Sequence, residues 1–581
     1  MPPKQSLSMA WLLQYLRPVK WRMVLLLFML LISIALQLVN PQIVQRFIDQ
    51  ATGSGTVSSL LALAGLYLVV AVLNQLFTVA LDYLGNDVAW RSTNRMRADL
   101  LKHTLRLDMR FHNRKTPGEM IERIDGDVTH MSNFFGMFIV QIVGSFVLLT
   151  GILGYMFVHS LPIAATMTAF TCLSIGVMFA IRNLGVKSSQ EERQANASLF
   201  GLIEERISGI EDVQANGGVP RLMNRYHRAM RAVFRSGLKA WMLRVTPWNA
   251  TVILFTIAVT AVLLISVRLY LHGEITLGTL FLFFQYTQML NDPMEQLGNQ
   301  LQEFQKAKSG MLRTRELLSS RSEIEDGVEE ALPDGPLSVS FEQVSFSYNE
   351  EQQVLHEISF DLKPGERLGL VGRTGSGKSS ISRLLLRLYN IDDGIIRIGG
   401  VDIRSLRLKA LYRRVGMVTQ DVQLFDGTLR DNLTLFNPNL SDEEVFETTD
   451  RLGLRPWIEA MPLGLDTRLT TGGASLSAGE AQLFALTRVF LTKPSLVILD
   501  EPSSRLDAAT EAALQTAVDQ LLERCTGIVI AHRLSTLDNV DKIMVLRQGR
   551  MIEFGARDAL AQNPSSEFFR LLQSDRQEEL A

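Results

Sequence analysis

The sequence predicts an α-helical membrane domain, with six transmembrane helices and long cytoplasmic helical extensions, followed by an α/β domain of the P-loop NTPase type. Three observations predict this division. Long apolar runs fill the first 310 residues, short strand-like runs and glycine-rich turns follow residue 337, and a phosphate-loop pattern lies at 372–379. A chain of 581 residues is too long for a single hydrophobic core, so at least two domains are expected. The formal net charge of −2 gives no sign of nucleic-acid binding.

Six apolar stretches are each near the roughly 20 residues that cross a bilayer as a helix. They are 22–45, 58–84, 134–158, 161–182, 247–271 and 276–298. Helices are expected because lipid cannot satisfy exposed backbone groups. The last stretch is the least apolar and is assigned from its length and context.

The distribution of lysine and arginine predicts the orientation of the spans in the membrane. The N-terminal segment and the long connections after spans two and four are rich in both residues, whereas the link 159–162 has neither. Because positive loops stay in the cytoplasm, we expect both termini on that side. The short architecture suggests the inner (plasma) membrane of a bacterium.

Both long connections have few turn signals and are expected to form amphipathic helices. Thr116-Pro117-Gly118 interrupts the first and Asn216-Gly217-Gly218 the second, so each predicts a helical hairpin that presents its tip to a cytoplasmic domain. The acidic stretch 319–336 ends in Pro and Gly and is interpreted as a linker. The predicted boundaries are a membrane domain at 1–318 and a nucleotide-binding domain at 337–581.

The strongest motif lies between a strand-like run at 367–371 and a helix-like run at 381–388. It comprises Gly372, Arg373, Thr374, Gly375, Ser376, Gly377, Lys378 and Ser379, and Ser380 follows directly. Glycines let backbone N–H groups approach phosphates, and the helix N-terminus adds positive potential. We expect Lys378 to contact the β- and γ-phosphates of ATP and the Ser379 hydroxyl to ligate Mg²⁺.

A second motif ends a buried strand-like run, 495–499, in the two carboxylates Asp500 and Glu501. Asp500 suits the shell of a magnesium ion. Glu501 is placed to polarise the attacking water. The alternative is that two carboxylates follow this strand by chance. A phosphate loop earlier in the chain makes this alternative less favoured.

Smaller features accompany these motifs. Leu476–Glu480, with Ser477 and Gly479, is either an anion site at a helix start or an ordinary helix N-cap. Tyr348 lies before the phosphate loop, where its ring could stack on adenine. Gln420 and His532 each follow a strand-like run, and His532 could contact the γ-phosphate. Ser504–Asp507 comes just after Glu501. Each alone is more often structural than functional, but their order argues for function.

In this order the residues resemble the ATP-binding cassette (ABC) transporter superfamily, and in particular its exporters with six spans fused to one cassette. The resemblance covers nearly the whole chain. It rests on Tyr348, the loop 372–379, Gln420, the signature 476–480, the strand 495–501, the turn 504–507 and His532. Phe111–Glu119 looks like the segment that reaches the cassettes in these exporters, and Ser208–Val213 is similar to the second such segment.

The resemblance implies a dimer in which two cassettes enclose two ATP molecules head to tail. Each site would combine one chain's phosphate loop, Glu501 base and His532 with the other chain's signature, which includes Ser477 and Gly479; Asp507 and Gln420 would contact nucleotide and metal. ATP would close the dimer and turn the membrane cavity outward. Hydrolysis would reset it.

Three departures from the family pattern affect the partner expected. Ala478 and Glu480 replace the usual Gly and frequent Gln, 470–474 lacks the usual charged residues, and Arg505 replaces a small residue. A methyl group at Ala478 could crowd the γ-phosphate of the partner's ATP. This favours one member of a heterodimer; a homodimer that tolerates Ala478 is the alternative.

The function expected is ATP-driven export or flipping of an amphipathic small molecule, lipid or peptide. An ATP-gated or regulatory membrane protein, or a fused importer, is the alternative. Polar residues in the spans could line a cavity or bond between helices; they are Gln37, Asn40, Asn74, Gln75, Gln141, Asn249, Gln285, Gln288 and Asn291. Fixed charge is scarce, with Asp82 and Asp292 near span ends, which mildly disfavours a strongly ionic substrate.

Overall fold

The computed structural model describes residues 14–53, 55–181, 185–349, 352–420, 422–469, 478–500, 508–531 and 534–579. The chain forms two compact units. One unit contains the residues up to Leu105 together with Pro117–Ser320, and the other contains Arg106–Thr116 and the residues from Arg321 onward. The connection after the second span therefore contributes eleven residues, 106–116, to the unit formed by the C-terminal half.

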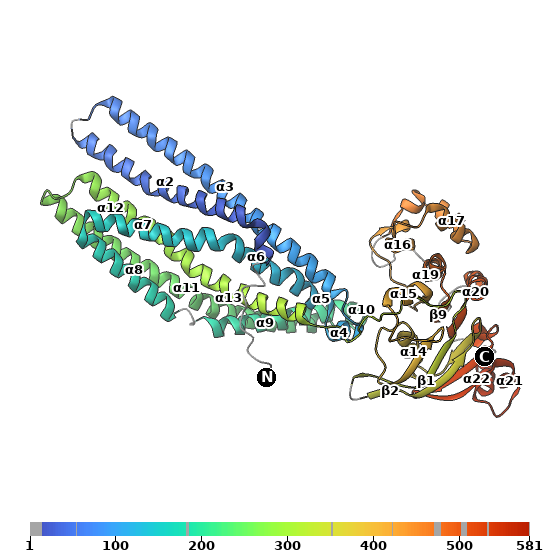
Figure 1. Cartoon of the computed structure of the whole chain (residues 1–581). Helices are drawn as coiled ribbons and strands as arrows, with labels where there is room; N and C mark the ends of the chain where they lie inside the picture. Colours follow the sequence, from blue (N-terminus) through green and yellow to red (C-terminus); the bar gives the residue numbers. More distant parts are fainter. Residues whose placement is uncertain are drawn as a thin grey trace. The chain divides into compact units, whose positions relative to one another are not determined.

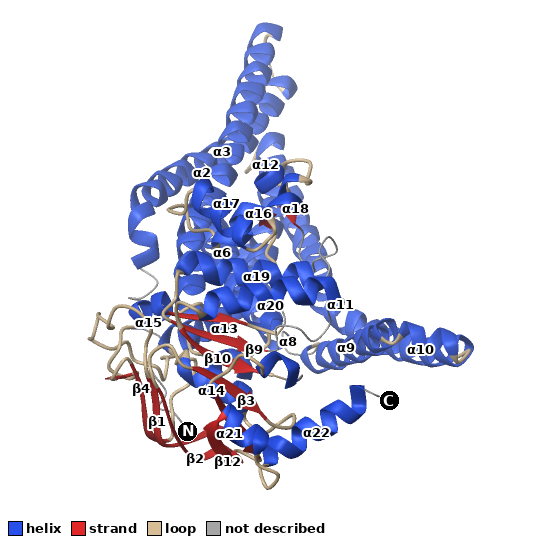
Figure 2. Ribbon diagram, turned by 90° about the vertical axis from the view of Figure 1, so that its right-hand side faces the viewer, coloured by secondary structure: helices blue, strands red, loops and turns tan. Residues whose placement is uncertain are grey.

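The described part of the first unit is helical (Figures 1 and 2). Its helices are α2 (Lys20–Thr52), α3 (Val57–Thr104), α5 (Pro117–Ile121), α6 (Asp127–Met137), α7 (Gly144–His159), α8 (Leu161–Ile181), α9 (Val186–Ser208), α10 (Ile210–Ala215), α11 (Val219–Leu271), α12 (Leu277–Met289) and α13 (Asn291–Ser319). A 3₁₀ turn, Arg17–Val19, precedes α2, and π-helical turns at Glu122–Gly126 and Phe138–Val143 join α5, α6 and α7. Figure 1 shows α2 and α3 packed side by side.

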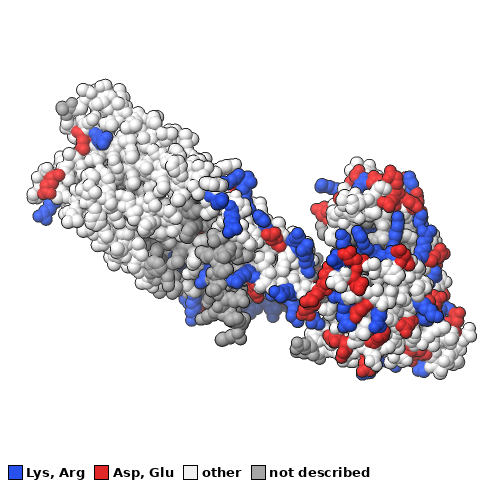
Figure 3. Space-filling model, viewed as in Figure 1, with Lys and Arg blue, Asp and Glu red and all other residues white. Residues whose placement is uncertain are grey.

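Length and composition identify four described helical stretches that can cross a membrane: Gln14–Thr52, Val57–Thr104, Pro117–His159 and Val219–Leu271. Residues 161–181 of the predicted span 161–182 form α8, whose apolar part Leu161–Val177 is shorter than the four stretches above. The predicted span 276–298 is divided between α12 and α13. On the face shown in Figure 3, charged side chains are sparse over the apolar helices, as expected of surface that contacts lipid.

Proline and glycine account for the main helix breaks. Pro293 has no amide to donate to the Met289 carbonyl, and the helix is interrupted at Leu290. In the first long connection, α5 begins at Pro117. In the second, Gly217 has a φ of +60° between α10 and α11, a conformation that glycine adopts without strain. Both breaks lie where the sequence predicts the hairpin tips.

The second unit contains all the described strands, drawn in red in Figure 2. They are β1 (Val339–Asn349), β2 (Gln352–Leu362), β3 (Arg367–Val371), β4 (Asp393–Ile398), β5 (Val401–Asp402), β6 (Val415–Val418), β7 (Gly427–Thr428), β8 (Arg468–Leu469), β9 (Leu496–Asp500), β10 (Thr526–Ile530), β11 (Lys542–Arg547) and β12 (Arg550–Ala556). Its helices are α4 (Met109–Arg114), α14 (Lys378–Leu385), α15 (Leu408–Arg414), α16 (Leu429–Thr434), α17 (Asp442–Arg451), α18 (Arg455–Glu459), α19 (Ala478–Thr492), α20 (Ala508–Leu522), α21 (Arg557–Gln562) and α22 (Glu567–Glu579).

These strands form a four-stranded sheet in the order β2-β1-β4-β5, a six-stranded sheet in the order β12-β11-β3-β10-β9-β6, and the small pair β7-β8. Strands β11, β3, β10, β9 and β6 run parallel to one another, whereas the edge strand β12 is antiparallel to β11. Their residues are buried on both faces, which explains the continuous apolar runs in the sequence. One core lies between the two sheets around α14, and a second lies on the opposite face against α19 and α20.

Of the predicted linker 319–336, residues 321–336 lie in the second unit and make specific contacts there, whereas 319 and 320 belong to the first unit. The buried Arg387 side chain donates to the Glu325 carbonyl at 2.8 Å and to the Leu406 carbonyl at 3.2 Å. Glu329 forms an isolated parallel bridge with Leu406. This stretch is thereby attached to the surface of the unit.

Candidate nucleotide-binding site

The six-stranded sheet brings the sequence motifs to one edge. The phosphate loop follows β3, Asp500 ends β9, and Gln420 comes two residues after β6. Leu370 of β3 and Asp500 of β9 both pair with Ile530 of β10. Because parallel strands present their carboxyl ends at the same edge of the sheet, this is where such folds bind ligands.

The phosphate loop is built by glycine conformations that other residues rarely adopt. Gly375 has a φ of +81° and Gly377 a φ of +105°. A Cβ atom on Gly377 would also lie 2.6 Å from the Leu355 side chain, so a larger residue requires both backbone strain and displacement. The loop is closed by a hydrogen bond from the Ser376 amide to the Arg373 carbonyl at 3.0 Å.

Two polar groups lie inside this loop. The Lys378 side chain is buried, and its ammonium donates to the Gly372 carbonyl at 2.5 Å, which holds it against the turn. The Ser376 hydroxyl is buried and has no hydrogen-bond partner among the described residues. A buried polar atom without a partner is costly. A cradle of glycine backbone, an ammonium and an unpaired hydroxyl fits a polyphosphate.

Strand alternation places the Asp500 side chain on the side of the phosphate loop. Leu496 and Ile498 belong to the core around α14, whereas Val497 and Leu499 belong to the opposite core. Asp500 continues the first series, so it faces the side covered by α14, which begins at Lys378. The sheet thus brings Asp500 and the start of α14 to one place, where Ser379 is exposed.

The backbone after Gln420 is held by residues that the motif analysis missed. Gln482 of α19 donates to the Gln420 carbonyl at 2.9 Å, and Arg488 donates to the Gln423 carbonyl at 2.9 Å. Asn432 exchanges two 2.8 Å hydrogen bonds with the Phe425 backbone. These side chains belong to no motif. The sequence marks them only as polar residues within helices that also carry buried apolar residues. They attach the segment after Gln420 to α16 and α19.

We predict that Arg488→Ala destabilises the second unit and slows ATP hydrolysis. Arg488 also donates to the Asn432 carbonyl at 2.8 Å, and burial lowers the pKa of its guanidinium. Losing its bonds leaves the carbonyl of the buried Asn432 without this donor, an expected cost of about 1–3 kcal/mol in the free energy of unfolding. Thermal unfolding and steady-state hydrolysis measure both effects, with exposed Arg413→Ala as the control. Equal melting temperatures for the two variants would contradict this role.

Tyr348 lies beside the phosphate-loop helix. Its hydroxyl is 3.0 Å from the Ser380 hydroxyl and accepts from Arg383 at 2.9 Å. The ring packs edge to face against Tyr389, with 5.0 Å between centroids. The structure therefore brings Tyr348 to the first turn of α14, next to the phosphate loop.

The helix α4 packs on the same part of the unit. Asn113 donates to the Tyr389 hydroxyl at 2.7 Å, and Arg110 pairs with Glu323 at 2.8 Å. Asp108 caps α4 through the Phe111 amide at 2.9 Å and accepts from the Glu323 amide at 2.6 Å. The first segment expected to reach a cassette therefore contacts the residues that surround Tyr348.

Several predicted site residues lie outside the described residues. They are Glu501, His532, Ser477 and Asp507, together with 470–476 and 504–506. The elements next to them are described. β9 ends one residue before Glu501, Ala531 follows β10 just before His532, and α19 begins at Ala478 with Gly479 buried in its first turn. The roles expected of the undescribed residues remain predictions.

The fold and the site define a P-loop ATPase domain fused to a helical membrane domain. Residues 23–294 match the family model of the ABC transporter transmembrane region, and residues 355–504 match that of the ABC transporter. An uncharacterized ABC transporter ATP-binding protein of Bacillus subtilis is 31% identical over 96% of this chain and 92% of its own length. A fatty acid ABC transporter ATP-binding/permease protein of Mycobacterium bovis is 31% identical over 87% of this chain and 80% of its own.

The fold has a match among solved structures. A bacterial Atm1-family ABC exporter with ATP bound superposes with a TM-score of 0.77 at 24% identity, over 94% of this chain and 96% of that one. The chain belongs to the ABC transporter family. It is a multi-pass membrane protein that binds and hydrolyses ATP to drive export, and it works as one half of a dimer.

Proposed function

We propose that this chain exports an amphipathic, largely hydrophobic molecule from the cytoplasm across the inner (plasma) membrane, with both termini in the cytoplasm, as one half of a heterodimer. The observation that carries the proposal is the packing of α4, from the connection after the second span, against the aromatic residues beside the phosphate loop. Nucleotide binding at that loop can thereby be sensed by a segment continuous with the membrane helices.

Mg²⁺ would be held by oxygen donors at the sheet edge, namely the Ser379 hydroxyl, the Asp500 carboxylate and the Gln420 side chain. An all-oxygen donor set suits this ion. When bound, it would neutralise charge on the β- and γ-phosphates. Lys378 would bind the same phosphates, with the loop amides and Ser376 orienting them. Tyr348 would stack on adenine.

Hydrolysis would depend on two residues outside the described ranges. Glu501 follows β9 directly and would accept the proton of the attacking water. His532 would hold the γ-phosphate. Across the dimer, Ser477 and Gly479 would contact the ATP bound to the partner's loop, where the methyl group of Ala478 would crowd the γ-phosphate. This predicts that the partner's site hydrolyses ATP slowly, as in an asymmetric pair.

A largely hydrophobic cargo is favoured by how the polar residues of the spans are used. Ser33 donates to Asn74 at 3.1 Å and accepts from Gln37 at 3.3 Å. Gln141 accepts from Gln300. These predicted cavity candidates therefore bond with other residues of the helical bundle, which leaves less polar surface for a cargo. The name of the mycobacterial relative, a fatty acid transporter, is consistent with an amphipathic substrate.

The experiment that tests the heterodimer is expression of the chain alone, with ATP hydrolysis measured after purification into lipid. We expect a folded chain with little ATPase activity. The site formed by this chain's own phosphate loop, Glu501 and His532 needs a partner that supplies a standard signature. Strong hydrolysis from a stable homodimer would contradict the heterodimer and leave the exporter assignment intact. The control is Ala478→Gly, which should raise the activity of any homodimer that forms.

A further inference from the structure

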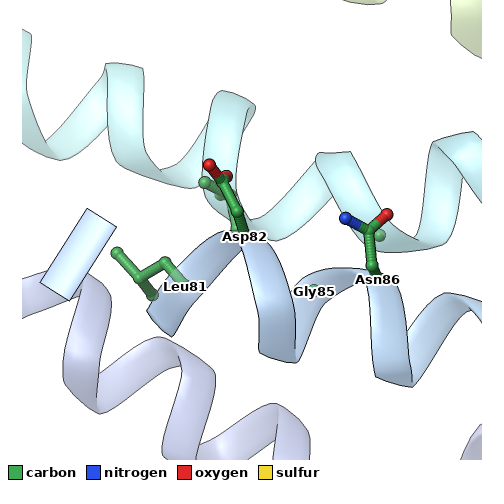
Figure 4. A pocket seen from close by; sticks show the side chains of 6 residues that line it. Leu81, Asp82, Gly85 and Asn86 are labelled. Atoms are coloured by element: carbon green, nitrogen blue, oxygen red, sulfur yellow. The ribbon is translucent and has the colours of Figure 1, made fainter. Parts of the chain in front are cut away.

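The pocket drawn in Figure 4 is too small for an organic ligand. It lies between α3 and the facing segment around Gly136, and it has room for about one water molecule. Leu81, one of its lining residues, is packed in the core. A contact that bears on ligand binding, and that belongs to no motif, lies instead beside the phosphate loop, around Tyr348.

Arg383 contacts Tyr348 in two ways. Its guanidinium donates to the Tyr348 hydroxyl at 2.9 Å, and the guanidinium carbon lies over the same ring, 5.7 Å from the centroid. An aromatic face attracts a cation at this distance. Arg383 is exposed, and among the residues that the structure describes it has no carboxylate partner. The guanidinium therefore contacts Tyr348 rather than an acidic side chain.

Three further side chains hold Tyr348. The Ser380 hydroxyl lies 3.0 Å from the Tyr348 hydroxyl. The buried rings of Phe346 and Tyr389 pack at nearly right angles to the Tyr348 ring, with centroids 4.8 Å and 5.0 Å away. Such edge-to-face pairs are favourable. The partly buried Tyr348 ring is therefore held in one orientation by contacts within the chain.

Both groups that bond to the Tyr348 hydroxyl belong to α14. This helix begins at Lys378 of the phosphate loop, and Ser380 and Arg383 lie three residues apart on one face of it. The orientation of the Tyr348 ring is thereby tied to the helix that carries the phosphate-binding residues. A side chain that is already ordered raises affinity, because less side-chain freedom is lost when the ligand binds.

We propose that Arg383 is a positioning residue for ATP, which holds the Tyr348 ring in the orientation that stacks on adenine. It acts through Tyr348 and makes no contact of its own with the phosphates. The inference rests on the proposed stacking of Tyr348 on adenine, and it adds the residue that prepares the ring for the base. Because the chemistry takes place at the phosphates, loss of Arg383 should raise KM for ATP and leave kcat unchanged.

A double-mutant cycle on ATP affinity tests this in the purified full-length chain in lipid nanodiscs. Affinity is measured by competition of ATP with a fluorescent ATP analogue. Arg383→Ala should weaken ATP binding about three- to tenfold, because a charged hydrogen bond and a cation–π contact are lost. Tyr348→Ala should weaken it about tenfold or more, as expected for loss of base stacking. The double variant should bind ATP within about twofold of Tyr348→Ala, since Arg383 then has no ring to position.

The control is Arg413→Ala, which removes another exposed arginine of the same unit and should bind ATP within about twofold of the wild type. Arg383→Lys keeps the charge but not the forked geometry, so it should recover only part of the affinity. In the assembly that hydrolyses ATP, Arg383→Ala should raise KM about three- to tenfold, with kcat within about twofold of the wild type.

Two results would overturn the role of Arg383. One is unchanged ATP affinity in Arg383→Ala. The other is a double variant in which the two effects simply add, which would mean that Arg383 acts on the nucleotide directly. Unchanged affinity in Tyr348→Ala would overturn the stacking itself, and the positioning role with it. Failure of the proposed export is separately visible, as hydrolysis without ATP-dependent transport while these affinities stay as expected.

Discussion

Replacing Lys378 by alanine is expected to weaken ATP binding at least about thirtyfold. The Lys378 ammonium is buried within the phosphate loop and held at the Gly372 carbonyl. Removing one partner of a buried charge pair costs about 2–5 kcal/mol, a loss of roughly thirtyfold or more in affinity. Equilibrium binding of a fluorescent ATP analogue measures it directly.

The matched control is Lys409→Ala on α15, an exposed lysine of the same unit. Its affinity for ATP should stay within about twofold of the wild type, because surface substitutions change little. Lys378→Arg keeps the charge but not the shape and should bind more weakly than the wild type. Unchanged affinity in Lys378→Ala would refute the assignment of the loop as the phosphate site.

Glu501→Gln is expected to remove hydrolysis while leaving ATP bound. The substitution preserves size and removes the acceptor for the proton of the attacking water. Loss of a general base typically lowers the rate by about 10²–10⁴-fold. Phosphate release and nucleotide binding, measured on the same preparation, separate the two effects.

Glu523→Gln serves as the control for this change, since Glu523 is an exposed glutamate of the same unit. It should hydrolyse ATP at the wild-type rate. If Glu501→Gln retained more than about a tenth of that rate, the base would have to be another group. Loss of nucleotide binding in Glu501→Gln would instead point to a structural role.

Much of the fold was predictable because its signals are local. The length of the apolar runs predicts α2, α3, α7 and α11, and Pro117 and Gly217 predict where the hairpins turn. The glycine-rich loop between a strand and a helix could be placed from its own residues, since only glycine adopts the φ values seen at Gly375 and Gly377 without strain.

What could not be predicted depends on contacts between distant residues. Nothing in the sequence shows that Arg488 and Asn432 hold the segment after Gln420, because ordinary polar residues on helices usually face water. The attachment of 321–336 through Arg387 was equally hidden, and an acidic stretch ending in proline and glycine was interpreted as a linker. The split of the last span also depends on the single residue Pro293.

The candidate site shows the same division. Strand alternation and sheet order, which no linear motif contains, place Asp500 on the face of α14. The contacts of Tyr348 with Ser380, Arg383 and Tyr389 likewise follow from the pairing of separate segments. The motifs predict the type of chemistry, whereas the tertiary structure determines which residues come together in the site.

The most direct test of the central claim is ATP-dependent uptake into inside-out membrane vesicles that contain the chain in the assembly that hydrolyses ATP. Fluorescent amphiphiles of positive, zero and negative charge would be compared for the wild type and Glu501→Gln. We predict ATP-dependent uptake of at least one amphiphile by the wild type and none by the variant. Hydrolysis that depends on Glu501, without ATP-dependent movement of any amphiphile, would contradict the proposed export of amphipathic molecules.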